Sequence, residues 1–228
     1  MSTGRVEWIV HAKVRLALYS MRARRDDAAP DARPLLLLHG LGERSPATLD
    51  PVFEAWPGEI HALDFTGHGL SDVPGGGGYT AEVLMGDVDA ALAHLGPLTL
   101  CGRGLGAYVA LLLAGARARE VHGAILCDGP GLAGGGASPS SPHVVHADPH
   151  ASGAPDPFAL VELAQDLRPA DYAVAYVRQA EQFAPIDQPI AVCARNRPGW
   201  LVAVIEAADT AVVPLEHALA RFAAAEPA

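Results

Sequence analysis

Short apolar runs separated by polar or glycine-rich segments recur along the chain and predict β-strands. The run at residues 34–38 holds four consecutive leucines and ends before His39 and Gly40. Such a run is typical of a central strand that is buried on both faces. The other predicted strands cover residues 6–10, 14–19, 59–64, 98–101, 121–127, 189–193 and 210–213.

Apolar residues at helical spacing predict helices between these strands. In residues 81–95, Leu84, Val88, Leu92 and Leu95 share one helix face, and Thr80 precedes them as an N-cap. Further helices are predicted at residues 105–116, 156–167, 171–182, 198–208 and 215–225. One alternative stays open, because the apolar residues 201–205 are also suited to the last strand.

This alternation of strands and helices predicts an α/β fold, with a mostly parallel twisted sheet of about eight strands and helices on both faces. A chain of 228 residues is the usual size of one domain. Residues 131–157 shift sharply to Gly, Ser, Pro, His and Ala. We therefore predict a single domain, residues 1–228, in which about residues 131–185 form a loop and a small helical cap inserted after the sixth strand.

Residues 98–114 are the most informative stretch, because they predict a buried strand, a glycine-rich turn and an apolar helix. The turn reads Gly102, Arg103, Gly104, Leu105, Gly106. Its spacing is that of G-x-S-x-G, a tight turn with a serine nucleophile at its tip. Gly104 stands in the serine position. That strained position costs an ordinary side chain about 1–3 kcal/mol, but glycine adopts it freely. The sequence thus predicts a preserved turn without its nucleophile.

Three motifs in order resemble the α/β-hydrolase family. They are His39-Gly40 after the third strand, DFTGHGLSD at residues 64–72 after the fourth, and the 102–106 turn after the fifth. The resemblance is strong over about residues 34–130 and weak beyond. It implies an oxyanion hole built from two backbone amides, one after the nucleophile and one after the third strand. These amides map to Leu105 and Leu41.

The residues around the turn also predict a ligand site. The N-terminus of the helix after it favours an anion, and Arg103 adds a positive charge nearby. The missing side chain of Gly104 leaves room for a carboxylate, a phosphate or a water molecule. We predict a small ligand, with an anion favoured, that contacts His39, Gly40, Leu41, Arg103, Gly104 and Leu105.

A serine hydrolase also needs a histidine base and an acid that orients it. The segment after the seventh strand, residues 194–197, holds no carboxylate. Asp128 after the sixth strand is a weak catalytic candidate; a cap on its own turn with Gly129 and Pro130 is favoured. His217 is the other weak candidate, and a surface position on the last helix is favoured for it.

Other residues with reactive or metal-ligating side chains give less evidence for a functional site. Cys101 lies inside a predicted strand and is interpreted as a buried structural thiol, and Ser71 belongs to a turn motif. His143, His146, Asp148 and His150 resemble ligand spacing, but the surrounding Gly/Pro/Ser-rich segment gives no sign of a rigid support. We predict neither a metal nor another cofactor.

The composition limits the compartments and the classes of partner that we expect for this protein. Half of the residues are hydrophobic and 18% are charged, as in folded globular proteins. The net charge of −10 disfavours nucleic acid and anionic membranes as partners. No run spans a bilayer, and residues 1–8 lack the features of a secretory signal. Cys101, Cys127 and Cys193 have no metal-like spacing and indicate reduced thiols, so we expect a cytoplasmic location.

Three functional hypotheses follow. The first is a non-catalytic α/β-hydrolase-like protein, a pseudohydrolase, that binds a small molecule. The second is a hydrolase of small esters or related substrates, in which His217 or His39 activates water in the space at Gly104. The third is an assembly role for residues 156–183, whose apolar stripe comprises Leu160, Leu163, Ala164 and Leu167.

Overall fold

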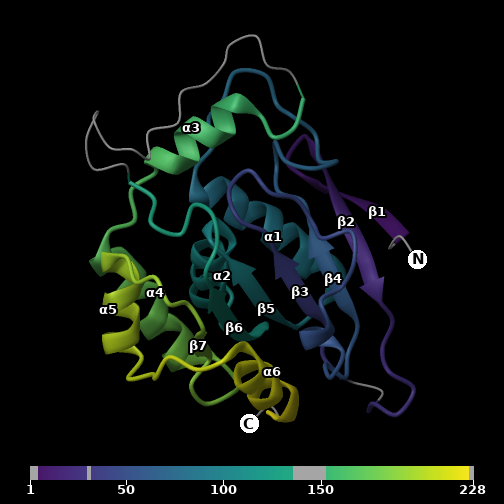
Figure 1. The fold of residues 1–228 in the computed structure, drawn as a ribbon, viewed down its shortest axis with the longest axis vertical. Helices are drawn as coiled ribbons and strands as arrows, with labels where there is room; N and C mark the ends of the chain where they lie inside the picture. The colour runs from purple at the N-terminus through teal and green to yellow at the C-terminus, as the bar shows by residue number, and fades with distance from the viewer. Residues whose placement is uncertain (1–4, 30–31, 136–152, 226–228) are drawn as a thin grey trace.

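The computed structural model describes residues 5–29, 32–135 and 153–225 and contains a seven-stranded sheet (Figure 1). The strand order is β1-β2-β4-β3-β5-β6-β7. The first three neighbours, β1, β2 and β4, pair antiparallel, and every other pair is parallel. The strands are β1 (Arg5–His11), β2 (Val14–Arg22), β3 (Leu35–Leu38), β4 (Ile60–Leu63), β5 (Leu98–Arg103), β6 (Val121–Cys127) and β7 (Ile190–Val192). The predicted mostly parallel α/β class is confirmed.

The eighth predicted strand is the main correction to the fold. Residues 210–213 form only one isolated bridge, between Val212 and Val192. The ladder ends there because β7 has three residues and Pro214, which has no N–H, follows Val213. The alternative strand at residues 201–205 is also wrong, since these residues lie within helix α5 (Gly199–Ala207).

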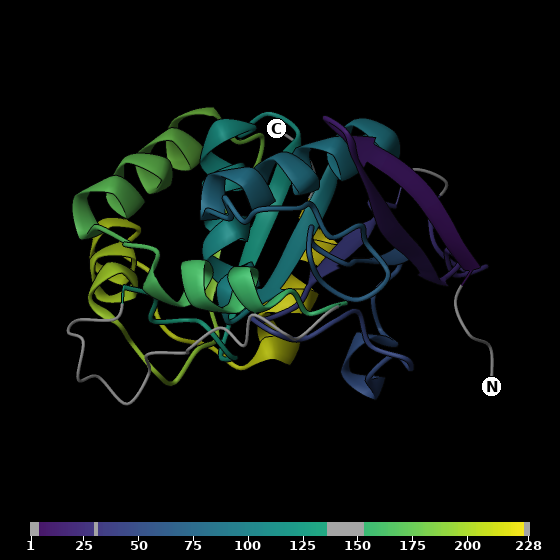
Figure 2. The same ribbon diagram turned by 90° about the horizontal axis from the view of Figure 1, so that it is seen from above.

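Helices cover both faces of the sheet, as predicted (Figure 2). One face packs against α1 (Ala81–Leu95), α2 (Leu105–Ala116), α4 (Ala170–Phe183) and α5. The other packs against α6 (Leu215–Ala224) and the short 3₁₀ helix η1 (Pro51–Phe53). All four residues of β3 are buried because β3 lies in the middle of the sheet, with apolar side chains on both sides.

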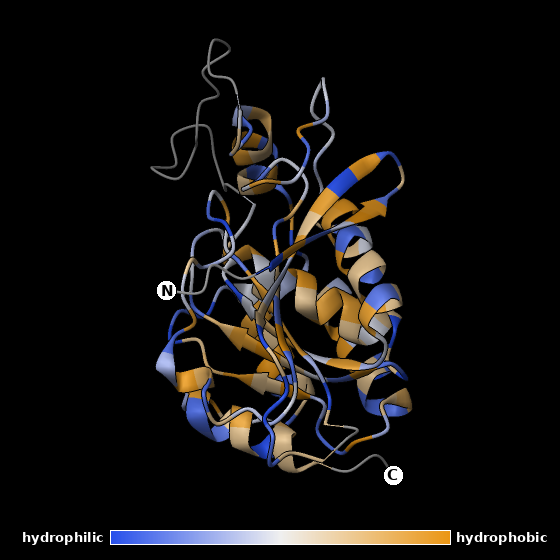
Figure 3. Cartoon of the chain, turned by 90° about the vertical axis from the view of Figure 1, so that its right-hand side faces the viewer, coloured by the Kyte–Doolittle hydropathy of each residue, from blue (hydrophilic) through white to orange (hydrophobic). Residues whose placement is uncertain are grey.

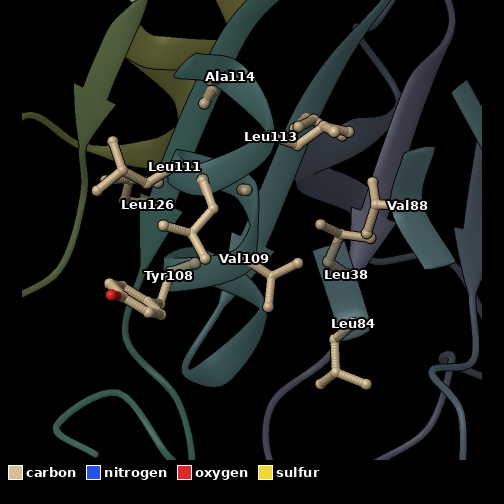
Figure 4. Close-up of a cluster of buried hydrophobic side chains, with 14 of the residues drawn as sticks. Leu38, Leu84, Val88, Tyr108, Val109, Leu111, Leu113, Ala114 and Leu126 are labelled. Carbon is tan, nitrogen blue, oxygen red and sulfur yellow. The ribbon is translucent and has the colours of Figure 1, made fainter. Parts of the chain in front are cut away.

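The centre of the larger core is α2, which packs against β5 and β6 of the sheet and against the helices α1 and α4. Figure 4 shows Tyr108, Val109, Leu111 and Leu113 of α2 beside Leu38 of β3 and other buried side chains. Eleven of the twelve residues of α2 are buried, which explains why its sequence is apolar on all sides. Figure 3 shows the strands in the middle of the molecule largely in orange, the colour of hydrophobic residues.

The segment that was predicted as a cap contains two helices with different surroundings. Helix α3 (Pro157–Gln165) is fixed to the loop before α1, because Glu162 accepts hydrogen bonds from the amides of Gly78 and Tyr79, both at 2.7 Å. Helix α4 packs directly on α2: a Cβ on Gly115 would lie 2.6 Å from the carbonyl oxygen of Tyr176. Helix α4 is therefore part of the layer that covers the sheet. The limits of the predicted cap stay a prediction.

The apolar stripe from the assembly hypothesis is not one continuous surface. Leu163 is fully buried in the molecule's own core, whereas Leu167 is 74% exposed. Among the described residues, no helix has the length and apolar character needed to cross a membrane.

Candidate functional site

The strand-turn-helix predicted from residues 98–114 is present, and Gly104 stands at its tip between β5 and α2. Its backbone angles are φ 58° and ψ −122°, which side chains rarely tolerate. The flanking glycines are required for close packing: a Cβ on Gly102 would lie 2.1 Å from the carbonyl oxygen of Gly106. The turn thus has the predicted geometry, and its tip carries no side chain.

The two amides expected to form an oxyanion hole converge on one acceptor. The Leu41 N–H lies 3.0 Å and the Leu105 N–H 2.9 Å from the carbonyl oxygen of Pro130. Their convergence is what the family resemblance implies. The oxygen that they bind, however, belongs to the chain itself, in the loop that follows β6.

The space predicted above Gly104 does not exist in this conformation. A Cβ at Gly104 would lie 2.0 Å from the oxygen of Pro130 and 2.6 Å from the carbonyl carbon of Gly129. The expectation of room for a carboxylate, phosphate or water molecule is therefore wrong. The chain fits so closely because Gly129 also lacks a side chain; a Cβ there would lie 2.7 Å from the Gly104 nitrogen. No local pattern reveals this contact between distant segments.

The loop that covers Gly104, residues 129–132, is held in place by the side chains of Arg168 and Trp200. Arg168 Nη1 donates to the carbonyl oxygens of Gly131 and Leu132, and Trp200 Nε1 donates to that of Leu132 at 2.9 Å. Arg168 is 8% exposed, and burial lowers its pKa to about 10. It remains charged at neutral pH. Sequence reasoning missed Pro130, Arg168 and Trp200, because none of them belongs to a recognisable motif.

The six predicted ligand-contacting residues divide into two groups. Gly40, Leu41, Gly104 and Leu105 all lie against Pro130. The amides of Leu41 and Leu105 donate to its carbonyl oxygen. A Cβ on Gly104 would lie 2.0 Å from that oxygen, and a Cβ on Gly40 would lie 2.8 Å from Pro130 Cδ. His39 and Arg103 instead line a cavity of about 580 Å³ on the α6 side of the sheet. A ligand role for these residues stays a prediction.

His39 is held as a neutral imidazole with both ring nitrogens engaged. Its Nε2 accepts a hydrogen bond from the Phe65 amide at 3.1 Å, so Nδ1 carries the proton and donates to the Gly40 carbonyl at 2.8 Å. Burial, together with the neighbouring His68, lowers the pKa of His39 to about 4. A histidine in this state connects loops and has no free nitrogen to serve as a base.

His68 repeats this arrangement. Its Nε2 accepts from the Gly42 amide at 3.2 Å, and its Nδ1 donates to the Thr66 carbonyl at 3.1 Å. Burial lowers its pKa below the ordinary value. The two rings lie 5.1 Å apart, centroid to centroid. The histidines of two family motifs thus hold the loops after β3 and β4 together.

The DFTGHGLSD segment is organised by the fully buried Asp64. Its carboxylate accepts hydrogen bonds from the Ser45 amide at 2.6 Å, the Leu70 amide at 2.8 Å and the Tyr19 hydroxyl at 2.9 Å. Ser71 donates its hydroxyl to the Asp64 carbonyl at 2.6 Å. The interpretation of Ser71 as a turn residue is confirmed.

Asp128 has a structural partner that differs from the predicted one. Its two carboxylate oxygens accept the amides of Arg195 at 2.6 Å and Asn196 at 3.0 Å. It therefore caps the loop after β7, and the expected cap on its own turn with Gly129 and Pro130 is wrong. The sheet brings Asp128 beside that loop because β6 and β7 are parallel neighbours.

His217 lies exposed in the first turn of α6, as its helical context predicted. Arg103 is also committed elsewhere: its Nη1 forms an ion pair with Glu43 at 2.6 Å, and the other oxygen of Glu43 accepts the Gly40 amide at 2.9 Å. The cation expected to attract an anionic ligand at the turn is thus already balanced by a carboxylate.

The three cysteines are free and lie on neighbouring strands or just beyond them. Cys101 is 6% exposed, which confirms it as a buried thiol. A hydrogen bond with Cys101, together with burial, raises the pKa of Cys127, and a hydrogen bond with Cys127 raises that of Cys193. Both thiols are therefore protonated at neutral pH, which makes them poor nucleophiles.

Metal-ligating side chains do not gather anywhere in the described part of the chain in a group of three or more that fits an ion. The His143, His146, Asp148 and His150 pattern lies outside the described residues.

Comparison with known proteins agrees with the fold and the motifs. The model of the alpha/beta hydrolase family matches residues 35–227. The chain belongs to this family. No curated protein is similar enough in sequence to be counted as a match.

Three solved structures resemble most of the chain. The esterase RhEst1 from Rhodococcus sp. ECU1013 has a TM-score of 0.63 at 19% identity, covering 93% of this chain and 90% of its own. A putative aryl esterase from Burkholderia cenocepacia has a TM-score of 0.61 at 18% identity, covering 90% and 85%. A thioesterase domain from the curacin biosynthetic pathway has a TM-score of 0.60 at 15% identity, covering 98% and 97%. At these identities the likeness shows the fold alone.

Proposed function

We propose that this alpha/beta hydrolase family member is non-catalytic and binds a small molecule. The observation that carries the proposal is the Pro130 carbonyl oxygen, which accepts both the Leu41 and the Leu105 amide. In an acyl-transfer enzyme these donors must be available to the substrate oxygen as negative charge develops on it. Here a substrate carbonyl would first have to displace the Pro130 carbonyl from these two amides.

That displacement is energetically unfavourable. Each backbone hydrogen bond contributes about 1 kcal/mol, and the Pro130 carbonyl would lose two of them. Arg168 and Trp200 hold the adjoining carbonyls of Gly131 and Leu132, so the whole turn must move. A substrate would have to compensate for all of these losses before any chemistry begins.

The alternative mechanism, with water at Gly104 and a histidine base, has less support. Gly129 and Pro130 occupy the position of the water. Both nitrogens of His39 are engaged by the backbone, and His217 is an exposed residue on α6. The esterase neighbours reported above are the observation in its favour, and they bear on the fold alone.

The proposal also includes the compartment in which the protein works and the class of partner that it binds. Protonated, unpaired thiols support a reducing compartment such as the cytoplasm. The net charge of −10 supports a small-molecule partner over nucleic acid or an anionic membrane.

The test combines turnover with covalent labelling. Purified protein is assayed with a panel of esters, lactones, amides and epoxides and treated with a serine-reactive phosphonate, next to an active serine esterase as positive control. We expect no turnover above the buffer rate and no labelling. Stoichiometric labelling of one residue, or turnover lost in His217→Ala or His39→Gln, would overturn the proposal.

A further inference from the structure

The cavity of about 580 Å³ lies beside the Gly104 turn and is separate from the position that Pro130 occupies over that turn. Its walls include Leu37 of β3, Cys101 of β5, Phe53 of η1 and Leu215 of α6. Leu41, Gly104 and Leu105 do not line it. Its volume falls within the range of about 300–1,000 Å³ that is typical of small-molecule sites.

The cavity exists because one stretch of the sheet has little helical cover. The long connection between β3 and β4 contains only the one-turn η1. Trp56 fills part of the space at 2% exposure, with its Nε1 donating to the Arg33 carbonyl at 3.0 Å. The carboxyl ends of β3 and β5 stay uncovered beside it, which leaves the side chains of Leu37 and Cys101 facing the cavity.

The inner wall is apolar and neutral. Leu37, Val52 and Phe53 contribute hydrocarbon, and the thiol of Cys127, whose pKa is raised by its hydrogen bond with Cys101 and by burial, carries no charge at neutral pH. A charged group placed against this wall would lose its hydration and gain no hydrogen bond or ion pair in exchange. The interior is therefore suited to a hydrocarbon chain or ring.

At the mouth of the cavity two hydrogen-bond donors have no acceptor among the residues that the structure describes, whereas the carboxylates there already accept hydrogen bonds from the protein. Arg44 lines the mouth, is exposed, and forms no hydrogen bond or ion pair with any described residue. Next to it Ser45, 8% exposed, has a buried Oγ without a hydrogen-bond partner. A buried hydroxyl in that state is rare in proteins and indicates that a partner is missing.

The acidic groups at the mouth are engaged by the protein. Asp128 accepts two amides, Asp50 accepts the Val52 amide at 2.9 Å, and Glu43 accepts both Arg103 and the Gly40 amide. A cationic ligand would have to compete with these donors. A ligand that brings an acceptor meets the unpaired Arg44 and lies next to the Ser45 hydroxyl, which has no hydrogen-bond partner in the described part of the chain.

We propose that this cavity binds an amphipathic monocarboxylate, with its apolar body against Leu37, Phe53 and Cys101 and its carboxylate at Arg44 and Ser45. The inference rests on the proposed small-molecule function and places the ligand in this cavity, next to the turn at Gly104 and not on it. A carboxylate suits the site because guanidinium and hydroxyl donors both pair with its two oxygens.

The experiment is calorimetric titration of the full chain with decanoate, compared with decanol and with decyltrimethylammonium. We expect decanoate to bind most tightly and the cation most weakly. Hydrolysis of 4-nitrophenyl decanoate is measured on the same protein. Turnover would contradict the proposed non-catalytic function, whereas absence of decanoate binding would contradict only the cavity proposal.

Two pairs of variants locate the binding site. Arg44→Ala should weaken decanoate binding about tenfold, the effect of one charge-assisted hydrogen bond, and leave decanol binding unchanged. Arg178→Ala, an exposed arginine on α4, is the matched control. Val52→Trp should fill the cavity and abolish binding of both compounds, while Val73→Trp on an exposed loop should not.

The melting temperature of each variant shows whether it is folded. If Val52→Trp fails to fold, the arginine pair still decides, because both arginines are exposed. Equal decanoate affinity in Arg44→Ala and Arg178→Ala, or tighter binding of the cation than of decanoate, would overturn the proposal.

Discussion

The two halves of the sheet's carboxyl edge differ in what they preserve. From β3 to the start of α2, the backbone makes a sharp turn at Gly104, and the amides of Leu41 and Leu105 converge on the carbonyl oxygen of Pro130. From the end of β6 to α6, the corresponding part supplies Asp128 as a loop cap and His217 as an exposed helix residue.

The difference shows which features of such a site the fold itself needs. The amides and the histidines of the first half are bonded within the protein, so they stabilise loops whether or not a substrate ever binds. An acid and a base serve only the reaction, and the described residues of the second half bring no such pair together.

The largest effect is expected for Gly104→Ser, which puts the family's usual residue back at the tip. The positive φ costs about 1–3 kcal/mol, and the overlap with Pro130 adds a similar amount. Urea unfolding should show a loss of more than about 3 kcal/mol. Gly76→Ser, at φ 94° with nothing within 4 Å of its Cβ, should lose about 1 kcal/mol. A Gly104→Ser protein of unchanged stability that reacts with the phosphonate would contradict the account.

Asp64→Asn should cost about 3 kcal/mol, because one of two buried acceptor oxygens becomes a donor that faces other donors. Its matched control is Asp72→Asn, which weakens an exposed ion pair with Arg15 at 3.0 Å and should cost less than about 1 kcal/mol. Chemical unfolding of both variants measures the difference. Similar losses would mean that burial of Asp64 does not matter.

Stability should fall as the pH is lowered from 7 to 5. The folded-state pKa of His39 is about 4, below the ordinary 6.5, so the unfolded chain takes up the proton first and is favoured. His39 alone should remove about 2 kcal/mol over this range, and His68 acts in the same direction. His11 acts oppositely, since its hydrogen bond with Asp87 raises its pKa.

The variant His39→Gln isolates this contribution. Its unfolding free energy should change less between pH 7 and pH 5 than that of the wild type, whatever its absolute stability. An unchanged slope would show that His39 is not held neutral.

Asp128→Asn should cost about 1 kcal/mol, because the loop after β7 loses part of its acceptor for Arg195 and Asn196. The loss should appear in thermal unfolding and leave the response to esters unchanged. A variant with normal stability but altered ester turnover would reassign Asp128 as a functional acid.

The smallest effect is expected for His217→Ala. An exposed helix residue without a structural role changes stability by less than about 0.5 kcal/mol. Denaturant unfolding and the ester panel should both match the wild type. Any loss of turnover would show that the second half of the edge does supply a base.

The sequence predicted the parts of the fold that depend on local patterns. Strand β3 and helices α1 and α2 were located from leucine runs, helical spacing and the Thr80 cap, because those signals lie within each element. The predicted eighth strand forms only an isolated bridge, since its pairing depends on the short β7 and on Pro214.

The candidate site was predictable only where one motif contains the relevant contacts. The shape of the turn at Gly104 follows from its own glycines. The position of Pro130 depends on a loop that returns from the end of β6, with Arg168 and Trp200 from later helices holding the residues beside it. Contacts of that kind leave no periodic trace in the sequence.

Amide hydrogen exchange of Leu41 and Leu105, measured by NMR on the wild-type protein, tests the central claim most directly. The first N–H of a helix ordinarily has no partner within the helix and exchanges quickly. We predict that the Leu105 amide, together with that of Leu41, is protected to a degree comparable with the interior of α2, because both donate to Pro130. Exchange of these two amides at the rate of an exposed loop would show that the hole is open and would contradict the account.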